Sequence, residues 1–188
     1  MIMRELETPR LALLPLQLAD AEEVQTLFPQ WEIVKYLNAR VPWPFPEDGV
    51  RTYYLETVLP GMARGEEWHW TLRRKADPEK IIGVISLHGS RDGNRGFWIM
   101  PEWRRQGLMT EAAAEATRFW FEELNQPVLR VKKASENAAS RAISVGEGMR
   151  CVGFSEEDYV CGRLPTELWE MDAAEWSSLR SARLYRHL

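Results

Sequence analysis

The feature that most constrains this chain is an abrupt change from turn-forming to helix-forming residues at positions 104–116, RRQGLMTEAAAEA. An apolar run precedes it, GFWIM at residues 96–100, which is typical of a strand. Behind Gly107, residues 108–124 carry apolar side chains at helical spacing, with Glu and Arg between them. The pattern predicts a strand, a tight turn and a helix in succession.

The turn in this unit has the properties of an anion-binding site. The first amide groups of a helix have no partner inside it, and together with the helix dipole they attract negative charge. Gly107 lets a bulky anion approach the backbone, and Arg104 and Arg105 place positive charge beside it. We interpret the turn as a cradle for a pyrophosphate. An ordinary surface turn before a helix would produce the same local pattern.

The string RRQGLM resembles the pyrophosphate loop Q/R-x-x-G-x-G/A of the GCN5-related N-acetyltransferase (GNAT) superfamily. Arg104 stands at its first position, Gly107 at its second, and Met109 where Gly or Ala is common. The string GLMTEA is similar to the branch that acetylates the N-termini of ribosomal proteins (RimJ/RimL), in which methionine at this point is familiar. The resemblance therefore points to that branch.

A second segment, SENAASRAISVGEGM, resembles the other cofactor-contacting segment of the same family, in which N-x-x-S opens a helix that ends at Gly-Phe. Asn137 and Ser140 match the first part, and Gly148 and Met149 stand in place of Gly-Phe. Helix capping alone would also explain the segment, with Asn137 as N-cap and Gly148 as C-cap.

Runs of apolar or alternating residues predict further strands. They fall at residues 10–16, 67–73, 81–88 and 128–134, with a pair of strands within 150–171. Residues 67–73, 81–88 and 96–100 would form a meander, and residues 128–134 would pair in parallel with the strand before the central helix. The resemblance covers roughly residues 6–171. It implies an α+β fold of three layers, with a mixed, mostly antiparallel sheet of about seven strands flanked by helices. Two parallel strands splay apart in this fold and form the cofactor cleft.

Turn-forming residues and caps predict the boundaries of the other elements. Asp20 is expected to cap a first helix, and a second helix is expected from residues 47–48 to Pro60. Residues 31–46, rich in aromatic residues and Pro, predict a rigid loop without regular structure. Turns are expected at residues 77–78 and 162–165.

Length and composition narrow the class of protein. The 188 residues, 45% of them hydrophobic, predict a single domain over residues 1–188, with residues 173–188 as a helical extension that packs on its own domain or on a second subunit. The chain could thus be a monomer or a homodimer. With 24 basic against 28 acidic residues, the charge argues against a nucleic-acid binder. Cys151 and Cys161 lack the spacing of a zinc site, and we expect no metal.

The N-terminus has no apolar signal segment, and no apolar run approaches the length of about 18 residues that a membrane span needs. We therefore expect a cytoplasmic protein without a membrane partner.

The resemblance implies acetyl-CoA as acetyl donor and a primary amine as acceptor, most simply the α-amine of a protein or peptide N-terminus. It implies cofactor contacts from Ile99, Met100, Arg104, Arg105, Gln106, Gly107, Leu108, Met109, Thr110 and Asn137. Ser140 occupies the position of a serine proposed to protonate the departing thiolate. Trp43, Phe45 and Tyr53 are candidates for the acceptor side, although hydrophobic packing would explain each of them equally.

The residue that accepts the proton of the amine is open. Some family members use a carboxylate on the strand before the pyrophosphate loop, but residues 96–100 contain none. An α-amine with a pKa of about 8 needs less help than a lysine at about 10.4. The sequence thus favours an α-amine or a weakly basic small amine, with Glu66, Glu67 and Glu136 as possible bases. Two alternatives are a drug or polyamine acetyltransferase and a non-catalytic CoA-binding sensor.

Overall fold

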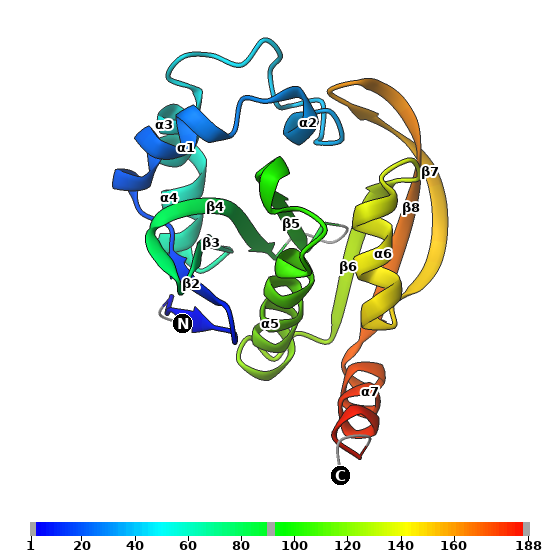
Figure 1. Ribbon diagram of the computed structural model, residues 1–188. Coiled ribbons are helices and arrows are strands. Elements are labelled where there is room, and N and C mark those ends of the chain that lie inside the picture. Colours follow the sequence, from blue (N-terminus) through cyan, green and yellow to red (C-terminus); the bar gives the residue numbers. More distant parts are fainter. Residues whose placement is uncertain (1–2, 90–92, 186–188) are drawn as a thin grey trace.

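The computed structural model of this chain describes residues 3–89 and 93–185. Within these ranges, eight strands form two antiparallel sheets flanked by helices (Figure 1). The strands are β1 (Leu6–Glu7), β2 (Leu11–Pro15), β3 (Glu67–Arg74), β4 (Asp77–His88), β5 (Arg95–Ile99), β6 (Val128–Ala134), β7 (Arg150–Tyr159) and β8 (Gly162–Asp172). The α-helices are α1 (Ala21–Leu27), α2 (Trp31–Val34), α3 (Gly49–Tyr53), α4 (Leu59–Arg64), α5 (Leu108–Glu122), α6 (Ala138–Glu147) and α7 (Ala173–Tyr185). Short 3-10 turns lie at Leu18–Asp20 and Pro101–Trp103, and a π-helical turn at Tyr54–Val58.

The two sheets meet at β5 and β6. Their strand orders are β1-β2-β3-β4-β5 and β6-β8-β7, so both β5 and β6 are edge strands. Just before β5, the backbone N–H of Asn94 donates to the carbonyl of Arg130 at 2.8 Å, and the N–H of Arg130 donates to Asn94 Oδ1 at 2.7 Å. These contacts join the beginnings of two strands that run in parallel, and no ladder continues between their described residues. The parallel ladder expected between these two strands is therefore wrong, because β6 pairs with β8 instead, whereas the splay that the resemblance implies is confirmed.

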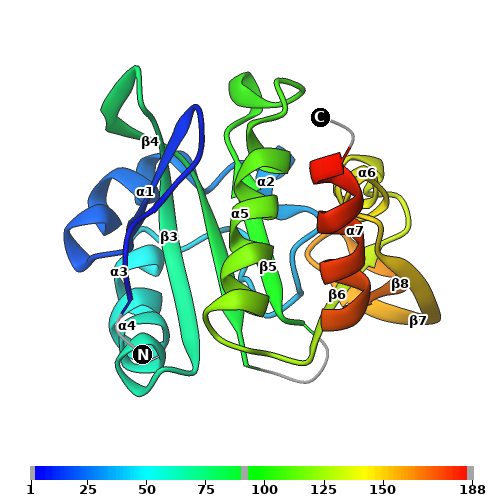
Figure 2. The same ribbon diagram turned by 90° about the horizontal axis from the view of Figure 1, so that it is seen from below.

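Helices cover both faces of the five-stranded sheet. On one face α5 packs into the largest core cluster, where the rings of Trp70 and Phe119 meet edge to face at 5.2 Å between centroids. On the other face α1, α3 and α4 enclose a second cluster that contains Val24, Tyr54 and Val84. Figure 2 shows β3 and β4 between these two groups of helices. The three-layer α+β architecture expected from the sequence is therefore present, with eight strands rather than about seven.

The helix expected to stop at Pro60 continues beyond it. Residues 49–64 form one continuous rod of α3, the π-helical turn and α4. Pro60 has no N–H to donate to the carbonyl of Glu56, and the π-helical turn lies directly before it. In that turn the N–H of Leu59 donates to the carbonyl of Tyr54, five residues earlier, and this shift of the hydrogen-bond pattern accommodates the proline. The expected loop at residues 31–46 likewise contains one regular element, α2.

Two predicted turns lie earlier than expected, and one predicted cap has another role. The β3–β4 turn is at residues 75–76 and the β7–β8 turn at residues 160–161. Both turns follow from the register of long paired strands, which overrides local turn preference. The carboxylate of Asp20 accepts the backbone N–H of Gln17 and a guanidinium N–H of Arg73, both at 2.8 Å, instead of capping α1.

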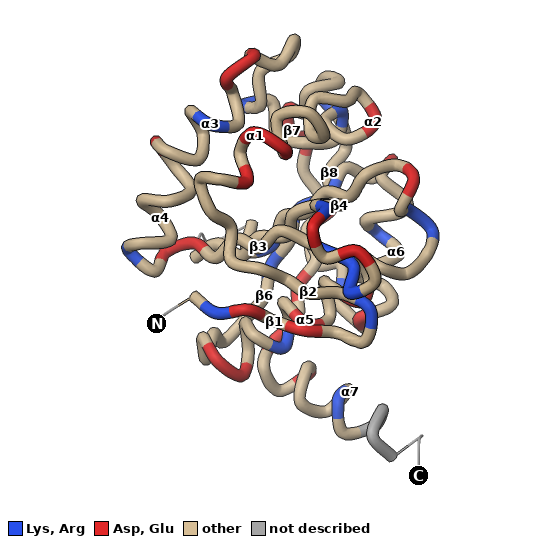
Figure 3. The backbone as a smooth tube through the Cα atoms, turned by 60° about the vertical axis from the view of Figure 1, so that its left-hand side comes forward, with Lys and Arg blue, Asp and Glu red and all other residues tan. Residues whose placement is uncertain are grey.

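The carboxyl-terminal helix α7 packs on its own domain. The indole of Trp176 stacks on the ring of Phe121 at 5.4 Å between centroids. Leu179 lies so close to Gly148 that a Cβ at Gly148 would be 2.7 Å from its Cδ1. None of the described helices combines the length and the apolar character needed to cross a bilayer. Figure 3 shows basic and acidic residues interspersed over the chain.

Candidate active site

A cleft of about 570 Å³ opens where β5 and β6 separate. Residues 97–99 of β5 form one wall, the amino end of α5 forms one end, and the beginning of α6 forms the opposite wall. The segment after α2 closes the remaining side. It is fixed to the β7–β8 turn, because the N–H groups of Val160 and Cys161 donate to the carbonyls of Leu37 and Lys35 at 3.0 and 3.1 Å.

The amino end of α5 presents backbone amides to this cleft. Gly107 is the N-cap with φ of 75°, a conformation that a side chain disfavours, and a Cβ there would lie 3.4 Å from Nη2 of Arg10. The amides of Leu108, Met109 and Thr110 are the first three of the helix and have no acceptor within it. All four residues line the cleft. The local geometry fits the predicted anion cradle.

The two arginines of the loop take different roles. The half-buried Arg104 donates from Nη2 to the carbonyl of Glu32 at 2.8 Å and from Nε to the carbonyl of Ile99 at 3.3 Å. Arg104 therefore braces the loop against α2 and the end of β5. Arg105 is exposed, with a left-handed φ of 59°, and its side chain lines the cleft. Arg105 is the loop guanidinium more available to a bound anion.

Arg10 is a third arginine at this helix end, and the sequence analysis missed it. It lies just before β2 and donates from Nη1 to the carbonyl of Gln106 at 2.9 Å. Its Nε donates to Oε2 of Glu111 in the first turn of α5 at 2.7 Å. About one hundred residues separate these partners in the chain, so no local pattern could have shown the contact.

The edge of β5 supplies further donors. The N–H of Met100 donates to the carbonyl of Ile82 in β4 at 2.9 Å. Because neighbouring residues of a strand point their polar groups to opposite sides, the N–H groups of Ile99 and Phe97 point away from β4 and toward the cleft. The bond from Arg104 to the carbonyl of Ile99 agrees with this direction. The cleft is thus lined by unpaired strand amides beside the helix end.

The wall formed by α6 carries the second predicted segment. Oδ1 of Asn137 accepts the backbone N–H of Ser140 at 3.2 Å, so Asn137 is the N-cap of α6, and Gly148 at φ 91° is its C-cap. Both residues therefore have the capping roles that the sequence allowed. Asn137 and Ser140 also line the cleft. The hydroxyl Oγ of Ser140 accepts a hydrogen bond from Nζ of Lys133 in β6 at 2.8 Å.

A buried ion pair lies behind this wall. Nη2 and Nη1 of Arg95 contact Oε2 and Oε1 of Glu147 at 2.7 and 2.8 Å, and Thr117 donates to the same carboxylate at 2.9 Å. Burial alone would raise the pKa of Glu147, but the charge and hydrogen bonds of Arg95 outweigh it and hold that pKa below its usual value. The pair ties the start of β5 to the end of α6 and fixes the closed end of the splayed strands.

Two predicted cofactor residues do not line the cleft. Met100 is 8% exposed and packs with Ile33 and Val34, and its Sδ accepts a hydrogen bond from Gln30. Gln106 is exposed, and its side chain donates to the carbonyl of Glu102 at 3.0 Å. Leu108 and Met109 line the cleft but bury their side chains in the core. Their contribution to an anion site comes from the backbone.

The three aromatic acceptor candidates also lie outside the lining of this cleft. Trp43 is exposed and its ring lies 5.7 Å from that of Trp31, whereas Phe45 packs on Phe28 at 5.2 Å. Tyr53 exposes nearly half its surface, and its partial burial, with the charge of Glu67, raises its pKa. Of the three, Phe45 is packed as the alternative interpretation expected, and an acceptor role for any of them stays a prediction.

The three possible bases do not gather at the cleft. Glu136 is exposed and lines the cleft, and Glu66 pairs with Arg64 at 2.8 Å. Glu67 accepts a hydrogen bond from Nε2 of His69 at 2.8 Å, with Nδ1 of His88 at 3.7 Å. These histidines lower the pKa of Glu67 to about 2.

A metal ion could be held by Glu67, His69 and His88, whose ligand atoms lie within 4.8 Å of one another. Their polar atoms already have hydrogen-bond partners, including Ser86 for Nε2 of His88 at 2.9 Å. The absence of a metal stays a prediction from the sequence.

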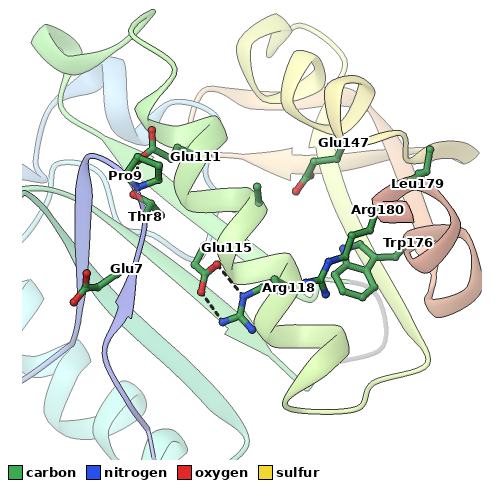
Figure 4. A pocket seen from close by; sticks show the side chains of 11 residues that line it. Glu7, Thr8, Pro9, Glu111, Glu115, Arg118, Glu147, Trp176, Leu179 and Arg180 are labelled. Carbon is green, nitrogen blue, oxygen red and sulfur yellow. Dashed lines mark hydrogen bonds and ion pairs between the residues drawn. The ribbon is translucent and has the colours of Figure 1, made fainter. Parts of the chain in front are cut away.

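A second cavity, of about 350 Å³, lies on the other side of α5, between the β1–β2 hairpin and α7 (Figure 4). Its charges are paired within the protein: Arg118 contacts Glu115 at 2.6 Å and Glu122 at 2.8 Å. None of the residues that line this cavity is among the first three of a helix, whose amides would be free to bind an anion. We therefore place the candidate site at the cleft between β5 and β6.

A family model described as an acetyltransferase (GNAT) domain matches residues 10–150, which is most of the chain. The chain belongs to the GNAT acetyltransferase family. The matched span includes residues 104–109, which resemble the family's pyrophosphate loop, and all of α6. The resemblance inferred from the sequence is thereby confirmed.

Known relatives point to two kinds of acceptor. YdaF of Bacillus subtilis (strain 168), provisionally named a ribosomal N-acetyltransferase, is 30% identical over 118 residues, 55% of this chain. The chain spans 57% of the length of that relative. Ribosomal-protein-S5-alanine acetyltransferase from Vibrio fischeri has a TM-score of 0.78 at 15% identity, covering 92% of this chain and 98% of its own. Spermidine N-acetyltransferase from Vibrio cholerae, solved with CoA and spermine, has a TM-score of 0.73 at 17% identity, covering 88% of this chain and 97% of its own. At these identities the solved structures establish the GNAT fold alone.

Proposed function

We propose that this chain, acting as one domain over residues 1–188, is an acetyl-CoA-dependent N-acetyltransferase. Its acceptor in this proposal is the α-amine of a protein or peptide N-terminus. The observation that carries the proposal is the helix end at Gly107, whose free amides open into a cleft between splayed strands. The ribosomal-protein enzymes among the relatives support the choice of acceptor.

The cofactor would lie along the cleft from α5 toward the closed end of the strands. The amides of Leu108, Met109 and Thr110 would bind the pyrophosphate, with Arg105 adding charge from the exposed side. The pantetheine arm would follow the edge of β5, where the N–H of Ile99 points away from β4 and into the cleft. Asn137 would act by holding α6 at the opposite wall. Acetyl-CoA supplies the activated acetyl group.

The chemistry would be direct attack in a ternary complex. The amine nitrogen forms a bond to the thioester carbonyl carbon while the C–S bond breaks. An outward-pointing N–H of β5, near Ile99, would polarise the carbonyl oxygen. The thiolate would take a proton from the hydroxyl of Ser140, which lines the cleft opposite β5. The proton lost by the amine would leave through water.

The acceptor preference follows from the acids near the cleft. The β5 wall at residues 97–99 carries no carboxylate, and the exposed Glu136 lies on the side of the α5 amino end and α6. An α-amine with a pKa of about 8 is partly neutral at neutral pH and needs no strong base. This supports an α-amine over a lysine side chain. A polyamine acceptor is the alternative that the spermidine acetyltransferase among the relatives favours.

Two measurements on the purified protein test the proposal. Calorimetric titration with acetyl-CoA should show binding, and thiol release should then depend on added N-terminal peptides more than on spermidine. Release with spermidine alone would favour the polyamine alternative. Binding of acetyl-CoA without thiol release, with either the peptides or spermidine, would favour a CoA sensor. No binding of acetyl-CoA would contradict the proposed site.

The role of Ser140 is tested by a matched pair of variants. Ser140→Ala should lower kcat by roughly a hundredfold, the scale of general acid catalysis, with little change in CoA affinity. Ser155→Ala, at an exposed position of β7, serves as the control and should leave both unchanged. Equal losses of kcat and CoA affinity in Ser140→Ala would make Ser140 a binding residue.

A further inference from the structure

Lys133 is a buried cation on the core face of β6. Leu129 and Val131 precede it at alternate positions, and both are buried in the largest core cluster. Lys133 continues this face and is 5% exposed. Alternation predicts an apolar residue there, and lysine is almost never fully buried unless it is paired. The charged position therefore needs an explanation beyond packing.

The partner of Lys133 is a hydroxyl that faces the cleft. Its Nζ donates to Oγ of Ser140 at 2.8 Å and lies 5.5 Å from the ring centre of Phe97. Ser140 and Phe97 line the cleft from opposite walls. Lys133 itself is not part of the lining, so it can act on a bound molecule through Ser140.

The chemistry of the two groups orients the hydroxyl. A lysine ammonium has three donors and no acceptor, so Oγ of Ser140 must accept from it. The hydrogen of Ser140 is then free to turn toward the cleft. The backbone of Ser140 is fixed by its bond to Asn137, which limits the directions available to Oγ. Lys133 thereby selects the donor orientation that a departing thiolate needs.

We propose that Lys133 and Ser140 form a proton relay for the leaving thiolate, an inference that rests on the proposed acetyl transfer. As the C–S bond breaks, the sulfur takes the proton of Ser140 Oγ, and that oxygen takes a proton from the ammonium of Lys133. Lys133 becomes a neutral amine and is reprotonated from solvent, which has received the proton lost by the acceptor amine. Ser140 is the catalytic residue, and Lys133 is a positioning and proton-supplying residue behind it.

The surroundings of Lys133 suit a group that must both give and regain a proton. Burial lowers its pKa to about 7, aided by the charge of Arg95 from β5 and opposed by Glu147 of α6 and Glu167 of β8. Arg141 of α6 pairs with Glu167 at 2.8 Å. A lysine with its ordinary pKa of about 10.4 would hold its proton too firmly for this exchange at neutral pH.

The relay has a pH dependence with a definite sign. It requires protonated Lys133, so kcat should fall as pH rises through the pKa of Lys133, near 7. Rising pH also deprotonates the acceptor amine, and this effect raises kcat. Comparing variants with the same acceptor separates the two effects, because the acceptor's contribution is common to all of them.

The decisive experiment compares Lys133→Arg, Lys133→Met and the control Lys132→Met, using acetyl-CoA and hexapeptides beginning with Ser or Ala between pH 6 and 9. Lys132 lies on the opposite face of β6, where it pairs with Glu157 at 2.9 Å. Lys133→Met should lower kcat by roughly a hundredfold. Lys133→Arg keeps a donor and a positive charge but cannot release its proton. It should therefore also be slow and should lack the fall of kcat near pH 7. CoA affinity should change less than twofold in all three.

The possible outcomes distinguish failure of the relay from failure of the proposed acetyl transfer. A wild-type kcat in Lys133→Arg, or a fall near pH 7 that persists in it, would overturn the relay while leaving the acetyl transfer intact. If Lys133→Met fails to fold, Lys133→Arg and the NMR titration of Lys133 in the wild type decide, and a pKa above 9 there would overturn the relay. A wild type without thiol release would overturn the proposed function and the relay together.

Discussion

Replacement of Gly107 by glutamate tests the anion cradle most directly. A side chain at this position would adopt φ of 75°, which costs an L-residue about 1–2 kcal/mol. Its Cβ would lie 3.4 Å from Nη2 of Arg10, and its carboxylate would reach the same helix end as the pyrophosphate. The added charge would compete for the free amides of Leu108, Met109 and Thr110 and repel the anion.

The expected loss of affinity follows from the number of donors. A hydrogen bond to a charged acceptor contributes about 1.5–3 kcal/mol, so the loss of two amide contacts corresponds to about 3 kcal/mol or more. Each 1.4 kcal/mol changes Kd about tenfold, and the dissociation constant for CoA should therefore rise by more than about a hundredfold. Calorimetric titration of the folded variant with CoA measures it.

Gly65→Glu is the matched control for this substitution. Gly65 has φ of 69° and ends α4, and a Cβ there would meet no atom within 4 Å. The control introduces the same charge and a similar backbone strain outside the cleft lining. Both variants should therefore lose similar stability, whereas CoA affinity should fall in Gly107→Glu alone. Wild-type affinity in a folded Gly107→Glu protein would refute the cradle.

Three further predictions concern stability. Glu147→Gln leaves Arg95 buried without its counter-charge and should lower the free energy of unfolding by about 3–5 kcal/mol in urea titrations. Asn137→Ala removes the N-cap of α6 and should cost about 1 kcal/mol, a fall in Tm of about 2–4 °C by calorimetry. The depressed pKa of Glu67, about 2, stabilises the fold above its unfolded pKa of about 4.3, and this contribution is lost as pH falls toward 2. Burial of His69 also lowers its pKa, so stability should begin to decline below about pH 6.5. Glu67→Gln should flatten the lower part of this decline in urea midpoints measured against pH.

Local patterns predicted the elements that position the site. The apolar run before Gly107, the helix after it and the strand at residues 128–134 all lie where the sequence placed them, because hydrophobic periodicity reflects which face must be buried. Asn137 was predicted as an N-cap from its residue type and position, and the cap is present. Turn positions at residues 77–78 and 162–165 were wrong, because strand register decides where a hairpin reverses.

Other features of the site could not be inferred from local pattern. The assignment of acceptor residues to the aromatic loop relied on family resemblance and stays a prediction. Trp43 and Phe45 contact other aromatic rings and lie outside the lining of the cleft at β5. Arg10 reaches the helix end from the residue before β2, and Arg95 pairs with Glu147 across more than fifty residues. Such contacts depend on how helices and strands pack on one another. The spacing of residues along a single sequence does not show this packing.

The sequence by itself determined a strand, a glycine turn and an amphipathic helix whose free amides attract an anion, since these follow from backbone geometry and residue type within a dozen positions. Only the tertiary structure decided what lies opposite that helix end. The divergence of β5 and β6 opens the cleft, and the packing of α6 on β6 places Ser140 against the buried ammonium of Lys133. The physical reason is that the pKa and orientation of a side chain depend on neighbours brought together by folding, and not on neighbours in the chain.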